Sequence, residues 1–220
     1  MLTNNVQQKL LQNSNKIVAV FLLFLLKTNI MSTKYKATEI SQAYFITITT
    51  VGWVDVFTRL NQKYVIINAL KHCQEHKGLT VFAYCLMHSH LHLFCRADGD
   101  LTLSEIMRDF KKYTSKKIIE TIHEEPESRR EWLLEHFRKS CEHLSRPQQY
   151  KVWQDGYHAE EVFSNTWIKE KIKYIHENPV KEMIVTEQED YYFSSARNYA
   201  DLDSALEVEV VFMGWDNHRV

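Results

Sequence analysis

The chain has 220 residues, 45% of them hydrophobic and 25% charged, and this balance excludes an intrinsically disordered protein. Its 5 Gly and 3 Pro are few beside 11 Tyr, 11 Phe and 5 Trp, so we expect packed regular elements in one main domain rather than long linkers. No two cysteines form a CxxC pair, which argues against a zinc ribbon or a dithiol redox centre. We expect free, buried thiols in a reducing cytoplasm, at Cys73, Cys85, Cys95 and Cys141.

The net charge of −1 gives no overall attraction for nucleic acid, but the charges are unevenly distributed along the chain. Residues 187–220 hold two basic and eight acidic side chains, which leaves 25 basic and 20 acidic ones, a charge of +5, on residues 1–186. A local basic face can bind phosphate even when the whole chain is close to neutral.

An apolar stretch, IVAVFLLFLL, occupies residues 17–26 between Lys16 and Lys27. It is shorter than the ~20 apolar residues that a membrane-spanning helix needs, and no A-x-A cleavage pattern follows it. Met31 begins a sequence, MSTKYKATEI, that is typical of a natural start. We therefore expect no membrane association, and we divide the chain into an N-terminal extension at 1–30 (a wrongly assigned start or an extra helix), one domain at 31–200 and an acidic tail at 201–220.

The first predicted element is a strand at residues 43–50 (AYFITITT), where β-branched and aromatic residues dominate. A helix follows at 63–76, with apolar residues at helical intervals, and Gly78 ends it. Two apolar runs, at 80–87 and 90–96, are separated by only two residues and predict an antiparallel hairpin.

The second half of the chain is predicted to be mostly helical. Thr102 or Ser104 can cap a helix over 101–123, which has an apolar face and a basic one. The remaining predicted elements are a helix at 127–146, a short strand or extended approach at 150–154, and a helix at 165–178 capped by Ser164 or Asn165 and ended by Pro179. This order of strands and helices predicts an α+β sandwich in which helices pack on a central antiparallel sheet.

Two histidines on the predicted hairpin are the first candidate site residues. His90 and His92 are two positions apart in a strand, so both side chains project from the same face of the sheet. Two imidazoles directed alike can hold one cation: histidine suits Mn²⁺ or Zn²⁺, and a mixed nitrogen and oxygen set also accepts Mg²⁺ beside a phosphate. A two-histidine motif alone is also explained by a half-exposed strand in a chain with 11 histidines.

His88 decides between two versions of this site. If the strand extends back to it, three histidines share one face, and His88 is either a third ligand or a neighbour that supports the ligands. If the bend at Ser89 rotates it away, His90 and His92 form the site without it. Both versions remain open at the level of sequence.

A second cluster of candidate residues lies in the helix KIKYIHENPVK, residues 171–181. Tyr174 and Asn178 are four positions apart and share one face of this helix. Asn178 can offer a carbonyl oxygen to a metal, and Tyr174 can attack phosphorus if nearby positive charge favours loss of its phenolic proton. The alternative is that both residues are structural.

A basic run on the helix at 101–123 is a candidate surface for phosphate contacts. Tyr113 lies within this run and is the rival nucleophile, but its neighbour four positions on, Lys117, has no metal-binding character. The basic residues are Arg108, Lys111, Lys112, Lys116 and Lys117.

Two segments carry a resemblance to a known family. YCLMHSHLHLF is similar to the strand with the HUH signature (His, hydrophobic, His), and YIHENPVK resembles the tyrosine-helix signature of REP-associated tyrosine transposases, which are IS200-like transposases. Weaker similarity runs from about Tyr35 to about Tyr199, and the two signatures in this order are more specific than either alone. The chain departs from the family at His88 and Ser89, where such proteins commonly have Pro-Asn.

The resemblance implies a ferredoxin-like core, usually a homodimer, that cuts and rejoins single-stranded DNA at a hairpin-forming end. By the same resemblance, His90, His92 and Asn178 hold Mg²⁺ or Mn²⁺, and Tyr174 forms a 5′-phosphotyrosine intermediate. Because that covalent bond conserves the phosphodiester energy, no nucleotide cofactor is needed.

Two other functions remain open on the sequence. A zinc-dependent hydrolase would use His88, His90 and His92 as ligands and a metal-bound water as nucleophile. A nucleic-acid-binding module without catalysis would keep the fold and bind DNA or RNA in the presence of a chelator.

Overall fold

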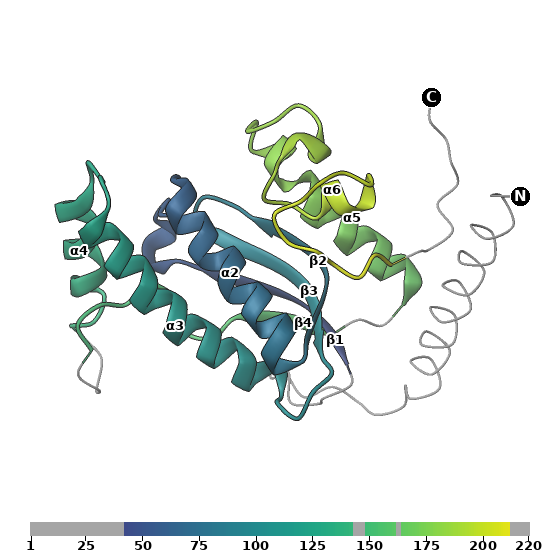
Figure 1. Ribbon diagram of the computed structural model, residues 1–220, viewed down its shortest axis with the longest axis horizontal. Helices are drawn as coiled ribbons and strands as arrows, with labels where there is room; N and C mark the ends of the chain where they lie inside the picture. The colour runs from purple at the N-terminus through teal and green to yellow at the C-terminus, as the bar shows by residue number, and fades with distance from the viewer. Residues whose placement is uncertain (1–41, 143–147, 162–163, 212–220) are drawn as a thin grey trace, which may run out of the picture. The chain divides into compact units, whose positions relative to one another are not determined.

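The computed structural model describes residues 42–142, 148–161 and 164–211 (Figure 1). The N-terminal extension predicted at 1–30 and the end of the acidic tail lie outside these residues. Within the described part of the chain, no helix combines the length and the apolar character that crossing a bilayer requires.

The core is a four-stranded antiparallel sheet with the strand order β2-β3-β1-β4. The strands are β1 (Ala43–Thr49), β2 (Leu79–Leu86), β3 (His90–Ala97) and β4 (His158–Glu161). Helices pack on this sheet, which confirms the predicted α+β sandwich. They are α2 (Leu60–Lys77), α3 (Leu103–Glu124), α4 (Arg130–Lys139), α5 (Asn165–Lys181) and α6 (Ala196–Tyr199), with short 3₁₀ helices at Val51–Trp53 and Gln188–Asp190.

The sheet has two different faces because side chains alternate along each strand. One face carries apolar pairs, among them Ile46 opposite Leu93, and α2 and α3 lie across it in front of the sheet in Figure 1. The thiol of Cys95 belongs to this face: burial and the neighbouring Cys73 of α2 both raise its pKa. The other face carries Thr47 opposite His92, and α5 packs against it.

Local signals set the ends of the first helices as the sequence predicts. Thr102 caps α3 through a full capping box with Glu105, each side chain accepting from the other residue's backbone N–H. Gly78 ends α2 with a φ of 69°, and a Cβ on it would lie 2.5 Å from the backbone nitrogen of Gly99. Only glycine fits this position, because both the left-handed backbone and the close approach exclude a side chain.

Pro179 does not end α5, so the predicted boundary at Asn178 is wrong. The helix continues to Lys181, with Pro179 buried inside its last turn. Proline removes one donor, but the amide N–H of Glu182 still bonds to Asn178 O at 3.0 Å, and that of Ile184 to Pro179 O at 2.8 Å. These hydrogen bonds complete the last turn of the helix although Pro179 itself has no N–H to donate.

One further boundary differs from the one expected. Helix α4 covers residues 130–139 of the helix predicted at 127–146, of which residues 143–146 lie outside the described part of the chain. Residues 150–154 approach the sheet through an isolated bridge between Trp153 and Thr50, which agrees with the predicted extended approach, and the short strand β4 follows them.

The chain after α5 returns along the outer edge of β2. Leu86 N–H donates to Phe193 O at 3.0 Å, Ser195 N–H donates to Tyr84 O at 2.9 Å, and Glu209 N–H donates to Val81 O at 2.9 Å. Leu206 in the same segment is buried. The first part of the segment proposed as an acidic tail therefore lies against the domain.

Candidate active site

His90 and His92 lie side by side on the face of the sheet that α5 covers. Their ring centroids are 4.7 Å apart, and both side chains are buried. The arrangement follows from strand geometry, because β3 projects every second side chain to the same face. The structure thus brings together the two histidines that were predicted as a metal-binding pair.

Both imidazoles are held in the neutral form, which is the form that binds metals. Burial is the main reason that the pKa of His90 is lowered to about 4; the charge of Asp55 opposes it, and His88 adds a smaller lowering effect. Burial, His90 and Lys171 lower the pKa of His92 to about 3, although Asn178 acts in the opposite direction.

Hydrogen bonds orient each ring through its Nδ1 atom. Thr47 Oγ1 lies 2.9 Å from His92 Nδ1, and Ser89 Oγ lies 3.1 Å from His90 Nδ1. The Nε2 atom of His92 is buried and has no hydrogen-bond partner. With the ring proton on Nδ1, donated to Thr47, the Nε2 lone pair is available to a ligand.

Helix α5 places Tyr174 against this pair. The centroid of its ring is 5.3 Å from that of His92 and 5.9 Å from that of Phe45, in both cases edge to face. Tyr174 is 40% exposed, so its phenol can be reached from solvent. The helix is fixed by a Ser164 cap on Trp167 N–H at 3.2 Å and by apolar residues on its buried side, Ile168, Ile172 and Ile175.

Asn178 lies one turn after Tyr174 and is 8% exposed. Its side-chain N–H group donates to Tyr174 O at 2.6 Å, which fixes the orientation of the amide. The amide oxygen is then left as the group that can face a ligand beside His92. The two residues that share a helix face in the sequence therefore also share a site with the histidines.

Sequence reasoning missed two lysines that flank the phenol. The ammonium group of Lys171 lies 6.0 Å from the centroid of the Tyr174 ring, and that of Lys181 lies 5.3 Å from it. Both also form ion pairs, Lys171 with Glu160 at 2.6 Å and Lys181 with Glu177 at 2.9 Å. Their positions, three before and seven after Tyr174, share its helix face, and this spacing was the signal available in the sequence.

The residues present fit a divalent metal with open coordination positions. His90 and His92 would supply nitrogen and Asn178 an amide oxygen, and the unpartnered Nε2 of His92 is the kind of buried atom that a metal satisfies. Within the described residues, no three His, Cys, Asp or Glu side chains come together as a metal cluster. His88 precedes β3, and among the described residues it does not join His90 and His92 in a three-histidine cluster that could hold zinc.

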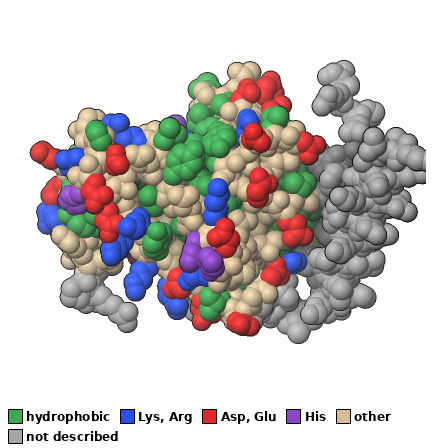
Figure 2. Space-filling view, in the orientation of Figure 1, with side chains coloured by type: hydrophobic (Ala, Val, Ile, Leu, Met, Phe, Trp, Pro, Cys, Tyr) green, Lys and Arg blue, Asp and Glu red, His purple; other side chains and the backbone are tan. Residues whose placement is uncertain are grey.

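The basic residues predicted to contact DNA lie on α3, across the sheet from the histidines. Acidic neighbours pair with several of them: Arg108 with Asp109 at 3.2 Å and Lys117 with Glu120 at 2.7 Å. Figure 2 accordingly shows Lys and Arg interspersed with Asp and Glu over α3 and α4. Lys111 donates to the backbone oxygens of Gln154 and Gly156, and burial lowers its pKa to about 8.

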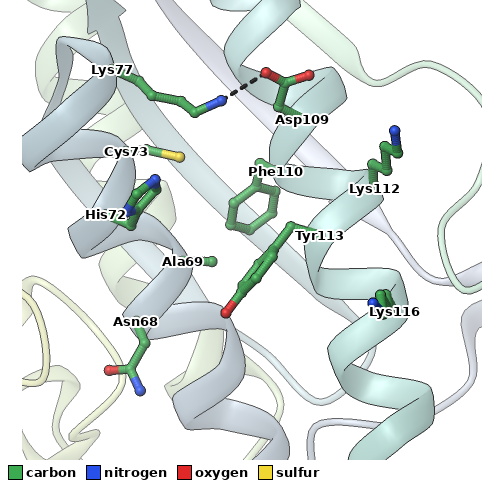
Figure 3. Close-up of a pocket in the computed structure, with 10 residues that line it drawn as sticks. All are labelled: Asn68, Ala69, His72, Cys73, Lys77, Asp109, Phe110, Lys112, Tyr113 and Lys116. Carbon is green, nitrogen blue, oxygen red and sulfur yellow. Dashed lines mark hydrogen bonds and ion pairs between the residues drawn. The ribbon is translucent and has the colours of Figure 1, made fainter.

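The rival nucleophile, Tyr113, is also on the far side of the sheet. It lines a pocket of about 560 Å³ between α2 and α3 (Figure 3). Lys112 and Lys116 lie on the rim of this pocket, and Lys77 and Asp109 form an ion pair of 2.7 Å within it. Tyr113 is thus separated from His90 and His92 by the sheet itself, and Tyr174 is the tyrosine that the fold places beside them.

Comparisons with known proteins bear on the family and on the fold. Residues 41–143, which include β3 and its histidines but end before α5, match the family model described as transposase IS200 like. A solved REP-associated tyrosine transposase bound to a REP hairpin has the same fold, with a TM-score of 0.54 and 17% identity over 86% of this chain and 99% of that one. A crystal structure of a putative transposase from Deinococcus radiodurans R1 matches 67% of this chain and 98% of its own, at 13% identity and a TM-score of 0.39. No curated protein matches the chain.

Proposed function

We propose that this chain, whose residues 41–143 belong to the IS200-like transposase family, cleaves and rejoins single-stranded DNA with Tyr174 as its nucleophile. The observation that carries the proposal is the contact between the rings of Tyr174 and His92, with the buried Nε2 of His92 left without a partner. This contact involves α5, which lies outside the family match, so it supports the proposal independently of the comparison.

The proposed substrate is a strand with its scissile phosphate between the histidine pair and Tyr174. The phenol loses its proton to solvent and attacks phosphorus in line; the bond from phosphorus to the tyrosine oxygen forms as the bond to the 3′ oxygen breaks. The products are a 5′-phosphotyrosine and a DNA strand with a free 3′ hydroxyl. Attack of a 3′ hydroxyl on the phosphotyrosine reverses these bond changes and joins the strands without a nucleotide cofactor.

Each neighbouring residue has a defined part in this reaction. His90, His92 and the Asn178 oxygen would hold Mg²⁺ or Mn²⁺, which when bound polarises the phosphate and offsets its developing negative charge. Thr47 and Ser89 keep the two imidazoles oriented through Nδ1. The ammonium groups of Lys171 and Lys181, which lie over the ring of Tyr174, would add positive charge near the phenol as it loses its proton.

The proposed DNA partner is a hairpin with an unpaired flank. This part of the proposal extends to the present chain what is known of its structural relative, which was solved bound to a REP hairpin. A homodimer, expected from the family resemblance, remains a prediction.

The direct test is to trap the covalent intermediate. A labelled hairpin oligonucleotide with single-stranded flanks, incubated with protein and Mn²⁺, should become attached to the protein as a band stable to denaturing electrophoresis. Tyr174→Phe should abolish the band, and the matched control Tyr113→Phe should retain it, because Tyr113 lies across the sheet. An adduct that survives Tyr174→Phe would exclude Tyr174 as the nucleophile.

A further inference from the structure

A tryptophan next to the histidine pair has no part in the reaction described so far. Trp53 is 61% exposed, and its ring meets that of His90 edge to face with the centroids 5.6 Å apart. Tryptophan is normally among the more buried residues, since its large apolar surface favours leaving water. An exposed indole beside a candidate active site therefore needs an explanation.

The backbone around Trp53 is strained in a way that directs the ring outward. Gly52 and Trp53 are both left-handed, with φ values of 64° and 56°. Glycine adopts this conformation readily, and a Cβ at position 52 would lie only 2.8 Å from the His136 ring. A bulky aromatic residue at positive φ is an outlier, and such strain is commonly retained where it serves a function.

The turn that carries Trp53 is tied firmly to the site. Thr50 N–H donates to Ser89 O at 2.9 Å, which fixes the turn to the residue before His90. The Thr50 hydroxyl lies 2.9 Å from Val54 O and 3.0 Å from Ser89 O. On the outer side, the Arg129 guanidinium donates to Asp55 O at 3.0 Å. These hydrogen bonds fix the backbone of the turn, and so they fix the position from which the exposed ring of Trp53 projects.

The Trp53 ring also continues a line of rings through the site. The ring centroids are 5.6 Å apart between Trp53 and His90, 4.7 Å apart between His90 and His92, and 5.3 Å apart between His92 and Tyr174. A strand whose phosphate lies between the histidines and Tyr174 would place an adjoining nucleotide near Trp53. Aromatic side chains bind unpaired bases by stacking, which tolerates any base because every base has a π face.

We propose that Trp53 is a stacking platform for an unpaired nucleobase next to the scissile phosphate, and that it holds the single-stranded flank of the substrate over His90 and His92. This inference rests on the proposed function, because it assigns a substrate contact within the same site. It also gives a reason for the strain at Trp53: the left-handed backbone presents the indole to DNA instead of burying it.

The test compares two substitutions that differ in their ability to stack. In a Tyr174→Phe background, which prevents turnover, we expect Trp53→Leu to lower affinity for a hairpin with a single-stranded flank by about 10-fold, since stacking of one base contributes roughly 5-fold to 100-fold. Trp53→Phe keeps an aromatic face and should remain within about 3-fold of the parent. A blunt hairpin without unpaired nucleotides should bind equally to all three proteins.

Two outcomes would overturn the inference: Trp53→Leu binding the flanked hairpin as well as the parent does, or losing the same factor on the blunt hairpin. Thermal unfolding of each variant, with a midpoint no lower than that of the parent, establishes that the comparison is between folded proteins. Failure of the parent to bind either hairpin would instead reject the proposed function, and the inference with it.

Discussion

The ring of Tyr174 on α5 stands edge to face against the ring of His92 on β3, with 5.3 Å between their centroids. The two residues belong to separate motifs, one in the central hairpin and one near the end of the domain. Their contact joins a candidate nucleophile to a candidate metal-binding pair within a single chain. The first prediction concerns the metal that this pair is proposed to hold.

Mn²⁺ should stabilise the protein through His92. At 100 times its dissociation constant, a ligand bound only by the folded state raises the free energy of unfolding by about 2.7 kcal/mol. We expect Mn²⁺ to raise the unfolding midpoint of the parent, and His92→Ala to abolish this rise, because the unpartnered Nε2 is lost.

His88→Ala is the matched control for this experiment. It should keep the Mn²⁺-dependent rise, because no third His, Cys, Asp or Glu joins the pair within the described residues. Loss of the rise in His88→Ala would make His88 a ligand. An undiminished rise in His92→Ala would place the metal elsewhere.

The basic face of α3 should contribute to DNA affinity through Lys112 and Lys116, which lie on the rim of the pocket between α2 and α3. If both lysines contact phosphates, the plot of the logarithm of the DNA association constant against the logarithm of salt concentration should become less steep by about 1 to 2 when both are replaced with Ala. The measurement is hairpin binding in the Tyr174→Phe background over a range of salt concentrations. An unchanged slope would remove this face from the DNA-binding surface.

Lys111→Met should behave differently from its neighbours. Its ammonium group is bound to the backbone oxygens of Gln154 and Gly156 and has a lowered pKa, so we expect its replacement to change the unfolding midpoint more than the salt slope. If Lys111→Met lowered the salt-dependence slope of DNA binding as much as the double Lys112 and Lys116 replacement does, Lys111 would contact DNA directly.

Glu127 should make stability depend on pH in the acid range. Burial raises the pKa of this carboxyl, but hydrogen bonds from the backbone and guanidinium of Arg129 and from Arg59 outweigh burial and bring the pKa to about 2. A folded-state value below the ordinary 4.5 means that the carboxylate stabilises the fold above pH 4.5, and that this contribution is lost as pH falls toward 2.

Glu127→Gln tests this dependence by chemical denaturation between pH 7 and pH 3. At pH 7 the substitution should lower the free energy of unfolding by about 2 kcal/mol, because two arginines lose their partner. At pH 3 the difference from the parent should shrink. A difference that is constant over this range would show that the charge of Glu127 has no role.

Trp53→Gly should separate stability from binding. Glycine tolerates the φ of 56° that Trp53 adopts, so relief of strain should raise the free energy of unfolding by up to about 1 kcal/mol. The same variant should bind the flanked hairpin less tightly than the parent. A fall in stability would mean that the contact of the indole with His90 contributes more than the strain costs.

The pairs within each motif could be predicted from the sequence because each depends only on local geometry. His90 and His92 share a face because strands repeat every two residues, and Tyr174 and Asn178 share one because helices bring every fourth residue together. Their meeting could not be predicted in this way. It depends on which face of the sheet α5 covers, and the spacing of the apolar residues along α5 does not specify that face.

Other features escaped prediction because the tertiary structure decides them. The segment His158–Glu161 contains no β-branched or aromatic residue, yet it forms β4 because β1 presents an edge to it. Lys111 has the same side chain as its neighbour Lys112, but only Lys111 reaches the oxygens of Gln154 and Gly156. The left-handed conformation of Trp53 is set by its neighbours rather than by its own preference.

The chain segment along β2 has a consequence for self-association. An uncovered edge strand offers a row of backbone groups to which a strand of another molecule can add. Here Phe193, Ser195 and Glu209 already bond to the backbone of β2, so its edge is occupied from within. Two copies cannot merge their sheets through β2 unless this segment first detaches. This segment therefore protects the edge of β2 against pairing with a strand of a second molecule.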